Sequence, residues 1–120
     1  MVEPIKGLPD NVIAYEAKGK VTGADYETVL IPAVEQKLKE HDKVRLLYYL
    51  GNEFSGFEAQ ALWDDAKVGL RHITAWERIA LVTDIGWIAT ATRAWGAVMP
   101  GAVRVFPNSE LSDAKAWVSE

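Results

Sequence analysis

The chain has 120 residues, of which 49% are hydrophobic and 25% are charged, and its formal net charge at pH 7 is -4. This length allows one domain with a single core, and the scattered, slightly acidic charge lacks the basic patch of a nucleic-acid-binding protein. The absence of cysteine excludes disulfides, thiolate nucleophiles and zinc-finger ligand sets. With no basic leader and no long uncharged apolar span, we expect a cytoplasmic protein that reaches a membrane only peripherally.

Two strands and a helix are predicted in the first third of the chain. Val2–Lys6 alternates in polarity and precedes a cluster of turn residues, as an edge strand does, and Val12–Val21 follows as a second strand. Thr22 is a helix cap, and the helix is expected to run to about His41. Pro32 lies inside that range, so we expect a kink or a fresh start there, with Pro32 in a first turn.

A buried strand, a loop and a second helix are expected next. Val44–Leu50 is a continuous apolar run, typical of a central parallel strand covered on both faces. Gly51–Gly56 is interpreted as a loop and Phe57–Ile73 as a helix. The expected core face of this helix comprises Leu62, Ala66, Gly69 and Ile73. Asp64 and Asp65 point about 100° apart on it and are assigned to solvent rather than to one shared catalytic site.

The last third repeats the alternation of strand and helix. Arg78–Thr83 is another buried strand, Asp84 is a candidate cap for a helix over Ile85–Met99, and Ala102–Phe106 is the last strand. A terminal helix follows from about Leu111. The order ββαβαβαβα predicts an α/β domain with a mostly parallel sheet and right-handed crossovers.

The helix over Ile85–Met99 is too apolar for one buried face. It contains two of the five tryptophans and a single charge, Arg93. At about 100° per residue the expected core line consists of Ile88, Trp95 and Met99. A second apolar surface, the tryptophan flank, consists of Trp87, Ala94 and Val98. We expect a ligand, a membrane, a protein or a second copy of this chain to cover the flank.

Aromatic residues extend this surface to the preceding helix. Trp63 lies at the margin of the core face of that helix, and Trp87 takes the same place on the next one. Phe54 and Phe57 follow a central strand at its carboxyl end, where open α/β sheets place ligands. The candidate surface for an apolar small molecule or a membrane is therefore Phe54, Phe57, Trp63, Trp87, Ala94 and Val98. A place in the core or in a homodimer interface is the alternative.

The chain resembles the SpoIIAA-like family of bacterial STAS-like domains along essentially its whole length. The matching stretches are GLPDNVIAYEAKGKVTGADYE, LIPA, GFEAQALWDDAKVGLRH, ERIALVTD followed by Trp87, and VRVFPNSELSDAKAWV. The resemblance implies helices mainly on one face of the sheet and no catalytic activity. It also implies kinship with anti-sigma-factor antagonists and with lipid-binding domains of the Sec14 type.

Ser55 is where this resemblance suggests regulation. Antagonist-type STAS domains have an Asp-Ser-Ser-Gly pattern before the second helix, whose serine a partner kinase phosphorylates. Here the same place reads Glu53-Phe54-Ser55-Gly56, so one serine and the glycine match. A helix cap is the favoured interpretation of Ser55, and a phosphorylated contact surface for a protein partner is the alternative.

No set of residues predicts a catalytic, metal or cofactor site. His41 and His72 stand at helix ends, where the helix dipole accounts for them, and neither has a second ligand three or four residues on. Nucleophile elbows, phosphate loops and dinucleotide fingerprints are missing. We therefore expect a non-enzymatic binding domain, with an interaction module of the anti-sigma-antagonist type as the alternative.

Overall fold

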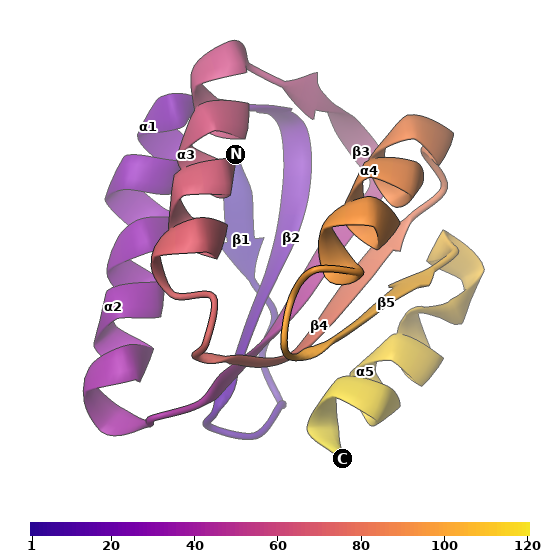
Figure 1. Ribbon diagram of the computed structural model, residues 1–120. Helices are drawn as coiled ribbons and strands as arrows, with labels where there is room; N and C mark the ends of the chain where they lie inside the picture. The colour runs from indigo at the N-terminus through magenta and orange to yellow at the C-terminus, as the bar shows by residue number, and fades with distance from the viewer.

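A five-stranded sheet in the order β1-β2-β3-β4-β5 is the centre of the computed structural model, which describes residues 1–120 (Figure 1). β1 is antiparallel to β2, and the other neighbouring strands are parallel. The strands are β1 (Val2–Pro4), β2 (Val12–Val21), β3 (Val44–Phe57), β4 (Trp76–Thr83) and β5 (Ala102–Phe106).

Most helices cover one face of this sheet. They are α1 (Gly23–Asp25), the π-helical η1 (Tyr26–Leu30), α2 (Ile31–Glu40), α3 (Ala59–Arg71), α4 (Gly86–Gly96), the 3-10 turn η2 (Asn108–Glu110) and α5 (Leu111–Ser119). The order of the parallel strands never reverses, so right-handed crossovers bring α2, α3 and α4 to the same face, while α5 packs on the other (Figure 1). The predicted α/β class, the mostly parallel sheet and the helices mainly on one face are confirmed.

Alternation along the central strands divides the core into two layers. On β3, Tyr48 and Leu50 turn toward α3 and α4, and Leu47 turns toward α5, where it joins Ala114 and Val118. All of these side chains except Tyr48 are almost fully buried, at 0–1% exposed. The apolar run predicted as a strand covered on both faces is therefore confirmed.

The first helix has the predicted cap and break. Thr22 Oγ1 accepts a hydrogen bond from the Asp25 backbone at 3.2 Å, and the Thr22 backbone donates to Asp25 Oδ2 at 2.8 Å. The π-helical turn η1 precedes α2, whose first turn contains Pro32. Proline has no backbone N–H group to donate inside an α-helix, so a new α-helix begins at Ile31, with Pro32 in its first turn.

β3 is longer than predicted. Residues 51–56, interpreted above as a loop, continue the strand to Phe57 and pair with β2 beyond a shift of register at Gly19. Gly19 has a φ of 59°, a conformation that favours glycine. The register shifts on both sides of Gly19 form a bulge in β2, at which Gly19 pairs with Phe54. The cap of α3 is then Glu58, so the interpretation of Ser55 as a helix cap is wrong.

Two boundaries of α4 also differ. The helix ends at Gly96 rather than at Met99, and its cap position is Ile85, so Asp84 does not cap it. Asp84 instead accepts a hydrogen bond from the Asn108 backbone at 2.9 Å and holds the turn after β5. None of the helices has both the length and the apolar character needed to cross a bilayer.

Candidate functional site

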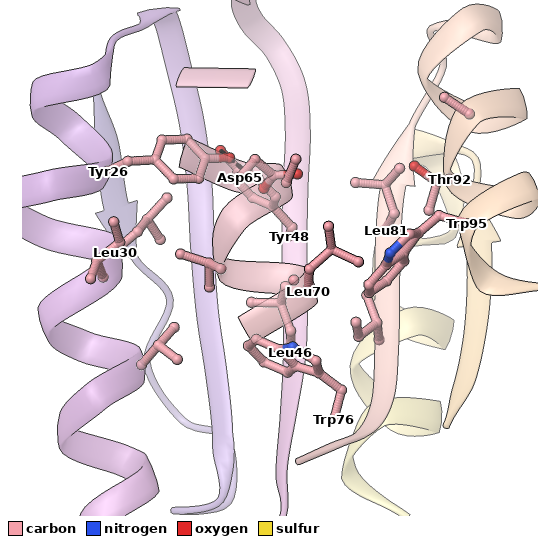
Figure 2. Close-up of a pocket in the computed structure, with 17 residues that line it drawn as sticks. Tyr26, Leu30, Leu46, Tyr48, Asp65, Leu70, Trp76, Leu81, Thr92 and Trp95 are labelled. Carbon is pink, nitrogen blue, oxygen red and sulfur yellow. Dashed lines mark hydrogen bonds between the residues drawn. The ribbon is translucent and has the colours of Figure 1, made fainter. Parts of the chain in front are cut away.

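A cavity of about 310 Å³ lies between the sheet and the helices η1, α2, α3 and α4 (Figure 2). Fourteen of the 17 residues that line it are hydrophobic. The strands contribute Leu46, Tyr48, Ile79 and Leu81 as its floor, because alternate residues of β3 and β4 face the helix layer. The cavity therefore lies between the sheet and the helices that cover its main face.

The two outer walls come from α3 and α4. Ala66, Gly69 and Leu70 line the α3 side, and Thr92 and Trp95 line the α4 side (Figure 2). Leu70 is 63% exposed although it lines the cavity, so this wall opens to solvent. The Trp95 ring reaches across to α3, where a Cβ atom on Gly69 would lie 3.1 Å from Cζ2 of Trp95.

A smaller cavity of about 130 Å³ continues the first one toward the carboxyl ends of the strands. The two share Tyr48, Asp65, Leu81, Ala91 and Thr92 in their walls. The smaller cavity adds Phe57, Leu62 and Trp87. We call both cavities together the interhelical groove.

Three polar side chains form a connected group in this apolar wall. The Tyr26 hydroxyl donates a hydrogen bond to Asp65 Oδ1 at 2.8 Å and lies 3.2 Å from the Tyr48 hydroxyl (Figure 2). Burial raises the pKa of the Asp65 carboxyl, and the hydrogen bond from Tyr26 opposes this shift in part. Burial also raises the pKa of both tyrosine hydroxyls. Protein atoms crowd around Asp65, but its side chain is itself exposed, because it lines the walls of both cavities.

The assignment to solvent is wrong for Asp64, whereas Asp65 is exposed as predicted. Asp64 is only 2% exposed; its Oδ1 accepts a hydrogen bond from Gln60 at 3.0 Å and lies 3.6 Å from Lys67 Nζ, while Oδ2 has no partner. Asp65 turns into the groove. α3 is rotated from its predicted orientation because Ala61 is fully buried and packs in one cluster with Tyr26 and Leu30 of η1.

The structure brings only some of the predicted surface residues together. Phe57 and Trp87 line the smaller cavity, and Phe54 packs on Phe57 with ring centroids 4.9 Å apart. Trp63 is 62% exposed and lies outside both cavities. Ala94 and Val98 are also exposed and line neither of them.

Large exposed hydrophobic side chains gather on the two helices beside the groove. Apart from Met1, they all lie on α3 or directly on and after α4: Leu62, Trp63, Leu70, Trp87 and Val98. We call these five residues the apolar rim. Single exposed hydrophobic residues are ordinary, whereas their concentration on two elements is a pattern typical of interaction surfaces.

The predicted core line of α4 is correct at two of its three positions. Ile88 and Met99 are buried, at 7% and 6% exposed. Trp95 is only partly buried and lines the larger cavity. A helix face that packs in the core and a helix face that lines a cavity have the same spacing of apolar residues. Periodicity therefore could not show that Trp95 lines a cavity.

The two histidines line neither cavity, and each contacts a carboxylate. His41 Nε2 and Lys37 Nζ lie 2.8 and 2.9 Å from the carboxylate of Asp10, and both partners lower the pKa of that carboxyl. Asp10, Glu40 and His41 offer ligand atoms within 4.8 Å of one another at the surface, but the Asp10 oxygens are already paired. His72 lies 3.2 Å from Glu35.

Comparison with known proteins agrees with this architecture. The family model described as SpoIIAA-like matches residues 12–119. A crystal structure of an uncharacterized protein of the DUF3478 family from Shewanella loihica PV-4, with a SpoIIAA-like fold, is 28% identical and superposes with a TM-score of 0.77. The match covers 98% of this chain and 92% of that one. No curated protein matches the sequence.

Proposed function

The chain belongs to the SpoIIAA-like family, and we propose that it is a non-enzymatic STAS-like binding domain that holds an apolar or amphipathic small molecule in the interhelical groove. The supporting observation is the cavity of about 310 Å³, with 14 hydrophobic residues among 17 in its wall. Ligand pockets in proteins are typically about 300–1,000 Å³, mainly apolar, with a few polar groups that orient the ligand. The groove matches that description in size and in lining.

The apolar rim supports a second part of this proposal, docking on a membrane surface. Trp63, Leu70 and Trp87 are each more than 60% exposed on the helices that flank the groove. An apolar ligand would enter between these helices, so a membrane that contacts the rim would lie at the mouth of the groove. The protein would then associate with the bilayer peripherally. A second copy covering the rim is the competing arrangement, and light scattering at several concentrations distinguishes the two.

A matched pair of substitutions on α4 tests the groove as the binding site. Ala91 lines both cavities, whereas Ala94 lies on the same helix and lines neither. Ala91→Phe adds a ring inside the groove, and Ala94→Phe adds the same ring outside it. We expect an uncharged dye that fluoresces in apolar surroundings to bind the wild type and Ala94→Phe, and to bind Ala91→Phe at least about tenfold more weakly.

Native mass spectrometry of the purified protein adds a readout that needs no dye. A copurifying apolar molecule that is present in the wild type and absent from Ala91→Phe supports the proposal. Equal dye binding by both variants, or no binding by the wild type, overturns it. Thermal melting of both variants shows whether each remains folded.

A protein-interaction module with Ser55 at its contact surface is the second candidate. Ser55 is exposed on the final part of β3, and Glu58 rather than Ser55 occupies the cap position of α3. Its side chain is therefore available to a partner. Incubation with a kinase-type anti-sigma factor should add the mass of one phosphate at Ser55; an unchanged mass removes this candidate.

A further inference from the structure

The polar group in the groove defines the kind of ligand that fits there. Tyr26 has one hydroxyl proton, and it donates that proton to Asp65 Oδ1 at 2.8 Å. The contact of 3.2 Å between the two tyrosine hydroxyls then requires Tyr48 to donate to Tyr26. Both tyrosine protons are used within the protein, and neither is available to a ligand.

Asp65 provides the one acceptor of this polar group that is free to bind a ligand. The protein donates one hydrogen bond to this carboxylate, at Oδ1, so Oδ2 is left for whatever enters the cavity. No cation of the protein pairs with Asp65, because Lys67 on the same helix pairs with Asp64 instead. The indole N–H of Trp76 also lacks a partner, but it is fully buried and offers a ligand no surface.

Building on the proposed function, we infer that the groove selects an amphiphile whose polar end is a cationic hydrogen-bond donor, an alkylamine in its simplest form. An ammonium group at Oδ2 would satisfy the free acceptor and supply the missing positive charge, while the alkyl chain would lie against Leu46, Leu81 and Trp95. A fatty-acid carboxylate would instead place a second negative charge beside Asp65 and find no tyrosine donor.

Three probes with the same chain test this inference: decylamine, decanol and decanoate, each titrated calorimetrically into the wild type at pH 7. A hydrogen bond between charged groups is worth at least about tenfold in affinity over a neutral one. We expect decylamine to bind at least about tenfold more tightly than decanol, and decanoate to bind most weakly.

Two variants separate the carboxylate of the groove from the net negative charge of the protein. Asp65→Asn keeps the shape and removes the charge, whereas Asp42→Asn removes one charge from an exposed loop. We expect Asp65→Asn to bind decylamine and decanol with similar affinity, and Asp42→Asn to keep the wild-type preference. Thermal melting confirms that each variant is folded.

The outcomes distinguish this inference from the proposed function. Similar binding of all three probes to the wild type, or a preference for decylamine that survives Asp65→Asn, overturns the inference and leaves the groove as an apolar binding site. Preference for decanoate also overturns it. Failure of every probe to bind removes the proposed function as well.

Discussion

Tyr26 and Asp65 lie 39 residues apart in the chain and are joined by a hydrogen bond of 2.8 Å across the wall of the groove. This bond links η1 to α3, and it is the one hydrogen bond that the protein donates to Asp65. The Tyr26 hydroxyl also contacts the buried Tyr48 hydroxyl, and a buried polar group that loses its partner is costly.

The Tyr26–Asp65 bond predicts a measurable coupling between these two residues. Tyr26→Phe removes the donor to Asp65 and leaves the buried Tyr48 hydroxyl without its partner, so it should lower the free energy of unfolding by about 1–3 kcal/mol. In a double-mutant cycle with Asp65→Asn, urea unfolding should give a coupling energy of about 1 kcal/mol. Tyr15→Phe, in β2 and outside this hydrogen-bonded group, should show no coupling to Asp65→Asn. A cycle in which Tyr26 and Asp65 are additive would contradict the bond.

The raised pKa of Asp65 predicts how stability depends on pH. The folded protein holds the Asp65 proton to a higher pH than the unfolded chain, whose carboxyl has the ordinary pKa of 3.8. Between these two values the folded state binds more protons, so this group lowers stability as pH rises through the window. Above the raised pKa the loss is complete, and below 3.8 it is absent.

Asp65→Asn should remove this loss. We expect its melting temperature to exceed that of the wild type at pH 7 and the difference to shrink toward zero near pH 3. Comparing the variant with the wild type at each pH cancels the opposite contribution of Asp10, whose pKa is lowered by Lys37 and His41. A difference in melting temperature that stays constant with pH would show that Asp65 titrates normally.

Close packing around Gly101 predicts a third effect. A Cβ atom on Gly101 would collide with the backbone carbonyl of Trp76 and lie 3.0 Å from that of Glu77, neither of which is a flexible side-chain end. Gly101→Ala should therefore destabilise the domain by about 1–3 kcal/mol. Gly86→Ala is the control, because nothing lies within 4 Å of its Cβ position, and it should change stability by less than about 0.5 kcal/mol. Equal melting of the two variants would refute the packing at Gly101.

The sequence predicted the strands well because their signal is local. Arg78–Thr83 and Val44–Leu50 are apolar runs, and such runs are buried on both faces wherever they pair. The continuation of β3 to Phe57 was missed because residues 51–56 contain turn formers and become a strand only by pairing with β2 beyond Gly19. The turn propensity of residues 51–56 conflicts with their long-range pairing, and the pairing with β2 determines their conformation.

The site was harder to predict than the fold. The apolar excess of Ile85–Met99 beside Trp63 indicated a surface between α3 and α4, and Phe57 and Trp87 do line the groove. Asp65 was missed because its partner Tyr26 belongs to another element, so no spacing along the chain relates them. The burial of Ala61 determines the rotation of α3. Small residues occur on more than one side of this helix, and a helical wheel does not show which side will pack against the rest of the protein.

Exposure of Trp87 predicts the last effect, on membrane binding. The side chain is 61% exposed and lines the smaller cavity, so a bilayer that contacts the rim would bury it. Trp87→Glu replaces that apolar area with a charge and should reduce flotation with phosphatidylcholine vesicles at least about tenfold. Thr90→Glu introduces the same charge at another exposed position of α4, outside the groove, and should float like the wild type. Equal flotation of the two variants would mean that charge rather than the rim governs binding, and a wild type that stays with the soluble fraction would exclude the membrane as the partner of this surface.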